Sequence, residues 1–214
     1  MYEEAEAAYA EVIDTADEIS GEAASLFTDD SNAVTVFNSL SWDRKALVEL
    51  PEYFAGAVDV DGQPIPVQFI DSLPYAEVQV PACGWTTVQP ADLCESANLL
   101  QGTVQATERS LENDLLRVEF NDRGEITSIF DKEINREISA GVCNSFKMYK
   151  DVPTNWDAWD LDSLYPLTPV ELDEPATIEV IAEGPIVAVL QVTRKLHDSD
   201  MVQEISLRAG SRRV

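Results

Sequence analysis

Histidine and basic residues are scarce in this sequence. His197 is the single histidine, and 14 lysines and arginines stand against 40 aspartates and glutamates, which gives a formal net charge of −26. One imidazole leaves very little material for an acid–base relay or a histidine-rich metal site. A surface this negative repels phosphate backbones and anionic lipid headgroups, so nucleic acid and membrane surfaces are not expected partners.

Cysteine is scarce as well, and long apolar runs are missing. Cys83, Cys94 and Cys143 have no short paired spacing, which argues against a zinc ribbon, a redox CxxC motif and a disulfide framework. A bridge between Cys83 and Cys94 is an alternative to buried free thiols in a reducing compartment. The N-terminus lacks the pattern of a signal peptide, and no apolar run approaches the roughly 20 residues of a membrane-spanning helix. We therefore expect a cytoplasmic protein.

Residues 1–26 have the apolar spacing of one amphipathic helix. Its other face is acidic, and Asp14, Glu18 and Glu22 place like charges four residues apart with no lysine to offset them. No capping residue precedes the pattern. We expect a helix that needs a packing partner, in a chain that starts inside a larger domain. The apolar stripe consists of Ala5, Tyr9, Val12, Ile13, Ala16, Ile19 and Ala23.

Short strands with alternating apolar residues follow the helix. Asp61-Gly62 predicts the turn of a hairpin over residues 58–67, and Pro51 ends an earlier strand. The other strands expected in this first sheet unit are residues 34–38, 45–50, 75–80 and 84–88.

A second set of strands is expected further along the chain. Gly124, in the turn at residues 121–124, is suited to a positive φ and predicts a hairpin. The chain still shows a strand pattern at Val214, which predicts an open sheet edge and a downstream part that has been cut away. The expected strands are residues 115–120, 126–130, 177–182, 186–195 and 202–209.

An aromatic and acidic stretch, residues 151–165, lies between the hairpins of this second set. Sugars bind with their apolar faces on aromatic rings while carboxylates accept hydrogen bonds from hydroxyls, and paired carboxylates could serve a glycosidase. In the structural alternative, Trp156 and Trp159 anchor the core and the aspartates cap turns. Calcium binding is a third interpretation, but the glycine and terminal glutamate of an EF-hand are missing. The residues concerned are Trp156, Asp157, Trp159, Asp160, Asp162 and Tyr165.

No catalytic residue and no metal ligand is expected within this chain. His197 lies in a polar turn, and nothing marks a serine or cysteine partner for it. The glycines form no phosphate-cradling run, so nucleotide binding has no support.

Four segments resemble the α-mannosidases of glycoside hydrolase family 38. Residues 36–44 (VFNSLSWDR) are similar to the strand that opens the family's first small sandwich. Residues 111–120 with 124–132 resemble the hairpin that opens its large supersandwich. Residues 155–160 (NWDAWD) are similar to a loop of the bacterial and cytosolic branch, and residues 205–214 resemble a strand that continues further in relatives. The four segments occur in the family's order and spacing.

The resemblance implies a mostly β fold behind an N-terminal helix. Residues 1–30 would be the last helix of a helical middle domain, and residues 31–100 a small antiparallel β-sandwich. Residues 101–214 would be the truncated N-terminal part of a large β-supersandwich of the galactose mutarotase-like kind.

The resemblance also implies a parent enzyme, a retaining α-mannosidase whose zinc ion is held by His and Asp residues. These ligands belong to an N-terminal catalytic domain whose motifs are missing here, so the zinc and the catalytic residues are expected in that domain. The family's sandwiches help to wall the sugar site. The resemblance therefore makes Asp157, Trp159, Asp160 and Tyr165 candidates for substrate binding, although the loop could instead fix a domain interface.

We therefore expect the non-catalytic region of an α-mannosidase that removes α-linked mannose from oligosaccharides, acting as scaffold and sugar-site wall. One alternative is a stand-alone carbohydrate-binding sandwich that uses Trp156, Trp159 and Tyr165. Another is a structural β-module that mediates assembly. The first hypothesis predicts an inactive chain that partners the missing catalytic domain and self-associates through the helix stripe and the open edge.

Overall fold

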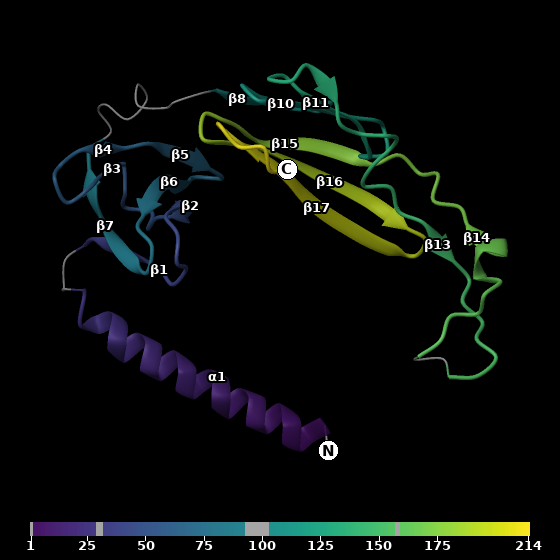
Figure 1. Ribbon diagram of the computed structural model, residues 1–214, viewed down its shortest axis with the longest axis horizontal. Coiled ribbons are helices and arrows are strands. Elements are labelled where there is room, and N and C mark those ends of the chain that lie inside the picture. The colour runs from purple at the N-terminus through teal and green to yellow at the C-terminus, as the bar shows by residue number, and fades with distance from the viewer. Residues whose placement is uncertain (1, 29–31, 93–102, 157–158) are drawn as a thin grey trace.

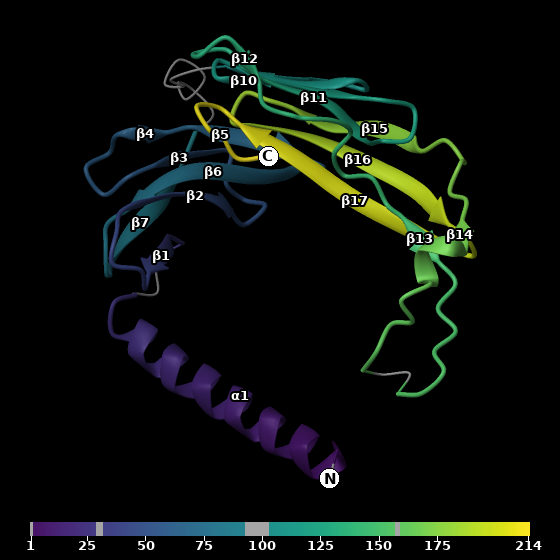
Figure 2. The same cartoon turned by 45° about the vertical axis from the view of Figure 1, so that its right-hand side comes forward.

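The computed structural model describes residues 2–28, 32–92, 103–156 and 159–214. One helix leads into two groups of antiparallel sheets that lie side by side (Figures 1 and 2). The mostly β fold expected from the sequence is confirmed. No helix in the described ranges has the length and apolar character needed to cross a membrane.

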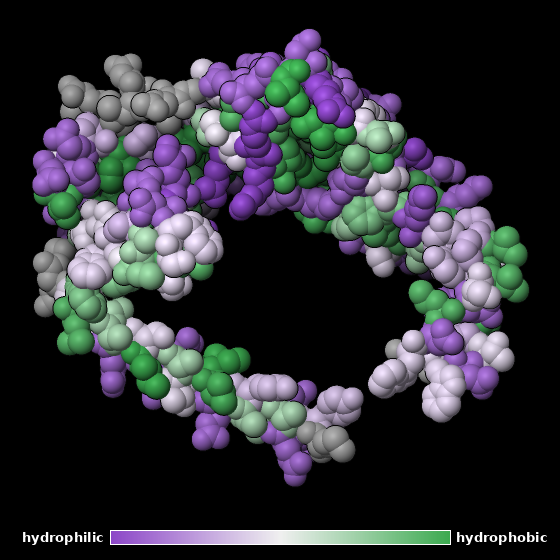
Figure 3. Space-filling model, in the orientation of Figure 1, coloured by the Kyte–Doolittle hydropathy of each residue, from purple (hydrophilic) through white to green (hydrophobic). Residues whose placement is uncertain are grey.

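Helix α1 spans Tyr2–Ser25, close to the range expected from its periodicity. None of its described side chains is buried, and it extends away from the sheets (Figure 1). Its apolar side chains lie uncovered in the space-filling view (Figure 3). The structure therefore shows the stripe without the packing partner that such a helix needs.

The first sheet group is a small two-layer sandwich. One layer has the strand order β1-β7-β3-β4 and the other β2-β6-β5, all antiparallel. Between the layers lies an apolar core that includes Leu50, Phe54, Val78 and Val88. The strands are β1 (Val34–Asn38), β2 (Arg44–Glu49), β3 (Gly56–Val58), β4 (Pro64–Ile65), β5 (Val67–Ile70), β6 (Leu73–Val80) and β7 (Gly84–Ala91).

The second sheet group packs a five-stranded sheet, β12-β11-β10-β9-β8, against a three-stranded sheet, β15-β16-β17. Leu111, Val118, Leu190 and Leu207 are among the fully buried residues between them. Two short strands, β13 and β14, form a separate pair. The strands are β8 (Val104–Thr107), β9 (Ser110–Asn113), β10 (Leu116–Phe120), β11 (Ile126–Asp131), β12 (Arg136–Glu137), β13 (Met148–Tyr149), β14 (Pro169–Val170), β15 (Thr177–Glu183), β16 (Val187–Leu196) and β17 (Ser199–Arg208).

A third, smaller apolar cluster joins the two groups. Val187 and Val189 of β16 pack with Leu47 of β2 and Ile70 of β5. The two groups therefore share buried surface.

Two expectations from the sequence prove wrong. The strand pattern does not continue to Val214, because β17 ends at Arg208 and Gly210, with φ +65°, turns the chain away. Cys83 is not a buried thiol, since it is free and exposed in the tight turn between β6 and β7, at φ +47°. The expected positive φ of Gly124 is confirmed at +69°.

Candidate functional site

The aromatic and acidic loop connects β13 to β14. Its base is closed by the β13–β14 pairing and by the Lys150 amide, which donates to the Thr168 carbonyl at 2.9 Å. From this base the loop projects away from the sheets, on the same side of the molecule as α1 (Figures 1 and 2). The loop is thus presented outward from a fixed pair of strands.

A buried polar network fixes the chain just before the loop. Ser145 Oγ donates to the Glu125 carboxylate at 2.7 Å, and the Arg194 guanidinium donates to the Gly124 carbonyl at 3.0 Å. Arg194 also lies over the Phe146 ring, 5.0 Å from its centroid. These contacts tie residues 144–146 to the β10–β11 turn and to β16.

The charge state of this network follows from its hydrogen bonds. Burial acts to raise the pKa of Glu125, but donors from Asn121 and Ser145 and the charge of Arg123 outweigh burial and lower the pKa overall. Burial lowers the pKa of Arg194, and the Glu125 charge opposes that shift. An ionised Glu125 therefore supports the strand that leads into the loop.

Tyr165 belongs to the base of the loop. Its ring contacts Tyr149 of β13 edge to face, at a centroid distance of 5.1 Å and an interplanar angle of 87°. It also begins the short 3-10 helix η2 (Tyr165–Leu167). Just before it, Asp162 Oδ1 accepts a hydrogen bond from the Leu164 amide at 2.7 Å. Asp162 thus caps a turn, as the structural alternative expected.

The two loop tryptophans are solvent-exposed. Trp156 is 74% exposed and Trp159 90% exposed, so the interpretation of both as core anchors is wrong. A turn holds them together, because the Trp159 and Asp160 amides donate to the Trp156 carbonyl at 2.7 and 3.0 Å. Trp156 itself adopts φ +63°. Large exposed rings are costly in water unless a ligand or another protein surface covers them.

The predicted site residues are only partly brought together. Trp159 and Asp160 are adjacent and exposed, whereas Tyr165 lies at the loop base against Tyr149. Asp157 lies outside the described residues. Within the described residues, the side chains of Trp159 and Asp160 are exposed to solvent and stand apart from the loop base. The arrangement offers a stacking surface beside a free carboxylate, which suits sugar hydroxyls.

Metal binding gains no support from this part of the chain. In the ranges that the structure describes, no three His, Cys, Asp or Glu side chains are grouped so that they could hold a metal ion. The described residues therefore do not fit a zinc ion.

Comparison with known proteins identifies the family. Residues 111–214 match the sequence profile of the glycosyl hydrolases family 38 C-terminal domain. The chain is 31% identical over 153 residues to human alpha-mannosidase 2C1, and 28% identical over 153 residues to the mouse protein of that name. Each alignment covers 70% of this chain, which spans only 14% of the length of each relative.

The fold agrees with that assignment. A solved structure of a glycosyl hydrolase family 38 protein from Enterococcus faecalis superposes with a TM-score of 0.50 at 12% identity, over 84% of this chain and 30% of that one. At this identity the superposition shows a shared fold alone. On the profile and the curated relatives together, residues 111–214 of this chain belong to the C-terminal domain of glycosyl hydrolase family 38.

Proposed function

We propose that this chain is a non-catalytic region of an α-mannosidase that hydrolyses α-linked mannose in oligosaccharides. The observation that carries the proposal is the match of residues 111–214 to a C-terminal domain of a glycoside hydrolase family. Both curated relatives bear the name alpha-mannosidase. The chain would act as a scaffold for a catalytic domain located elsewhere in a longer polypeptide.

The exposed loop would form part of the wall of the sugar site. Trp159 would stack on an apolar sugar face, and Asp160 would accept hydrogen bonds from hydroxyls. Asp157 belongs to the same proposal on sequence grounds alone, and Tyr165 would set the position of the loop base through Tyr149. The common projection of α1 and the loop favours a catalytic domain on that side (Figure 2).

The zinc ion and the retaining mechanism belong to the same proposal. They would reside in the catalytic domain, since the described residues here do not fit a zinc ion. Free thiols at Cys83 and Cys143 suit a reducing compartment, so we place the enzyme in the cytoplasm.

The wall is tested by Trp159→Ala and Asp160→Asn in the full-length enzyme. Loss of stacking by Trp159→Ala should lower kcat/KM for an α-mannoside by about tenfold, mainly through KM, because stacking is worth roughly 1 kcal/mol or more. Trp42→Ala, at another exposed tryptophan on the small sandwich, is the matched control and should leave the kinetics unchanged. If the Trp159 and Trp42 variants had equal kinetics, the loop would not form part of the wall of the sugar site.

A second candidate is a stand-alone carbohydrate-binding sandwich, which the exposure of Trp156 and Trp159 favours. It predicts that the 214-residue chain alone binds a mannoside saturably and that Trp159→Ala abolishes this binding. A scaffold whose loop works only beside the catalytic domain predicts no such binding.

A further inference from the structure

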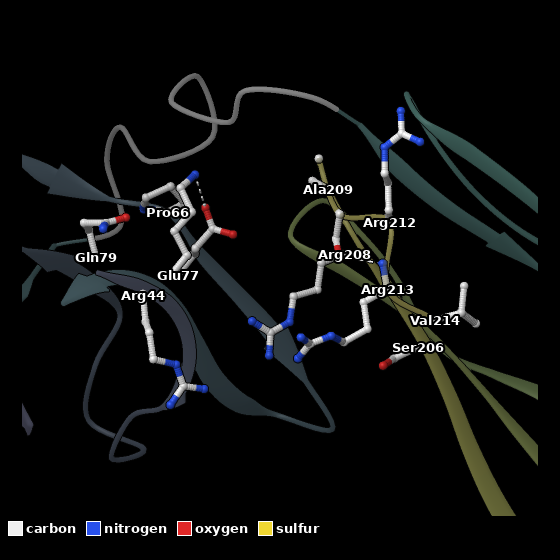
Figure 4. Close-up of a pocket in the computed structure, with 13 residues that line it drawn as sticks. Arg44, Pro66, Glu77, Gln79, Ser206, Arg208, Ala209, Arg212, Arg213 and Val214 are labelled. Atoms are coloured by element: carbon white, nitrogen blue, oxygen red, sulfur yellow. Dashed lines mark hydrogen bonds and ion pairs between the residues drawn. The ribbon is translucent and has the colours of Figure 1, made fainter. Parts of the chain in front are cut away.

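A cleft lies between the small sandwich and the C-terminal end of β17. Its volume is about 1270 Å³. One wall carries Arg44 and Lys45 of β2 with Glu77 of β6, and the other carries Arg208, Arg212 and Arg213 (Figure 4). Within the described residues, five of the chain's 14 basic residues therefore line this cleft together with one acidic side chain, that of Glu77.

Two of these five cations are neutralised. Lys45 Nζ lies 3.1 Å from Glu77 Oε1, so the one acidic side chain that the described residues place in the cleft is already paired. Arg212 pairs with Asp131 and Glu133 of the second sheet group. The ion pairs within the described part of the chain do not include Arg44, Arg208 or Arg213. Three guanidinium groups thus remain available to a ligand.

The wall that carries Arg208 and Arg213 is anchored to the second sheet group. Asn113, only 2% exposed, donates to the carbonyls of Arg208 and Ser211 at 2.7 Å each. The ion pair of Arg212 with the buried Asp131 anchors the next turn of chain. Arg208 and Arg213 extend toward the small sandwich, whereas Arg212 points to the top of the view, away from these two side chains (Figure 4). The backbone is therefore arranged before any ligand arrives, which lowers the entropic cost of binding.

The chemistry of the ligand follows from these groups. A guanidinium presents paired donors that match phosphate and carboxylate oxygens, and it cannot lose its proton. The overall negative charge is screened beyond a Debye length of about 8 Å at physiological salt, so local arginines decide the potential in the cleft. The cleft is larger than a bare anion needs, which favours a small molecule that carries the anionic group.

We propose that this cleft binds a small multivalent oxyanion, a phosphate ester or a polycarboxylate, between Arg44 on one wall and Arg208 and Arg213 on the other. The site does not depend on sugar hydrolysis. It is distinct from the β13–β14 loop, since none of that loop's described residues lines the cleft.

The test is calorimetric titration of the 214-residue chain with inorganic phosphate and with citrate, at constant ionic strength set by chloride. We expect saturable binding of one equivalent of at least one of the two anions. The double variant Arg208→Gln/Arg213→Gln should weaken it about tenfold or more, since each arginine supplies charge-assisted hydrogen bonds. Arg44→Gln, on the opposite wall, should also weaken anion binding when it is introduced alone. Arg136→Gln, at an exposed arginine outside the cleft, makes the same charge change per residue and should not.

The relative affinities for phosphate and citrate identify the class of ligand, and the behaviour of the variants tests whether the cleft binds it. Tighter phosphate binding assigns the site to phosphate esters, and tighter citrate binding assigns it to polycarboxylates. The proposal is overturned if neither anion binds saturably, or if the Arg44 and Arg208/Arg213 variants bind as well as the Arg136 variant. Binding of a heparin oligosaccharide without phosphate or citrate binding also overturns it. Unchanged circular dichroism spectra of the unliganded variants verify that each is folded.

Discussion

The side chain of Gln68 and the backbone of Val187 are joined by two hydrogen bonds. Gln68 Nε2 donates to the Val187 carbonyl at 2.8 Å, and Gln68 Oε1 accepts from the Val187 amide at 2.9 Å and from the Ile186 amide at 2.8 Å. Gln68 is 4% exposed and belongs to β5. Its amide therefore acts as a piece of strand backbone that links the small sandwich to the second sheet group.

Replacement of Gln68 by Ala should destabilise the chain by about 3 kcal/mol, because three buried backbone groups lose their partners at about 1–3 kcal/mol each. Urea denaturation measures this loss, and we expect the two sheet groups to unfold in separate transitions in the variant. Gln105→Ala, at an exposed position of β8, is the control and should change little. A single transition with unchanged midpoint in the Gln68 variant would show that the two groups do not depend on this link.

Gly124 and Gly62 allow a matched comparison of backbone strain and steric overlap. Both have positive φ, +69° and +77°, but a methyl group at Gly124 would overlap Val192 Cγ1, whereas nothing lies within 4 Å of one at Gly62. Gly62→Ala should cost about 1 kcal/mol, the price of a left-handed conformation. Gly124→Ala should cost about 2–4 kcal/mol, because overpacking adds to that strain. Equal losses in thermal or urea denaturation would mean that the β10–β11 turn moves freely away from β16.

Glu137 should contribute to the acid sensitivity of the fold. Hydrogen bonds from the Ser128 and Ser139 hydroxyls and from the Ile129 and Ser139 amides lower its pKa from 4.5 to about 2. A carboxyl group whose folded pKa is lowered stabilises the fold above its ordinary pKa, and this stability is lost as the pH falls through the folded value.

Glu137→Gln should therefore flatten the decline of unfolding free energy between pH 4.5 and about 2. Urea denaturation across this range measures the effect, with Glu171→Gln, at an exposed position, as the charge-matched control. A decline as steep in the Glu137 variant as in the unmodified chain would contradict the assignment.

Helix α1 should gain helicity when its acidic row is interrupted. Glu18→Lys turns two like-charge pairs, with Asp14 and Glu22, into opposite-charge pairs, each worth about 0.2–0.5 kcal/mol. Because no described α1 side chain is buried, tertiary packing does not mask this gain. Far-UV circular dichroism should show more helix for Glu18→Lys than for Glu18→Gln, which only removes the repulsion. The same signal for both variants would show that charge pairing does not limit the helix.

Features with local causes could be predicted from the sequence. The 3.6-residue period of residues 2–25 and the Gly124 turn depend on neighbouring residues, and both were found where expected. Strand β5 and the hairpin of β8 with β9 were missed. The β5–β6 turn has positive φ at Asp71 and Ser72 without a glycine, and the β8–β9 turn at residues 108–109 contains none of the usual turn formers.

Features built from distant segments could not be predicted in this way. The Gln68–Val187 link and the cleft between Arg44 and Arg208 depend on how two sheet groups pack, which no single segment encodes. The candidate loop could be predicted in part. Its aromatic and acidic composition was evident, but the exposure of Trp156 and Trp159 required the structure, since the same residues would also suit a core.

We propose that this chain supports a mannosidase active site that lies in a separate catalytic domain. Hydrolysis of a chromogenic α-mannoside by the full-length enzyme and by the 214-residue chain, each with and without a zinc chelator, tests that claim most directly. The account predicts that the full-length enzyme cleaves the substrate, that the chelator stops it, and that the chain alone is inert. Turnover by the 214-residue chain, or a full-length enzyme that leaves α-mannosides intact, would contradict it.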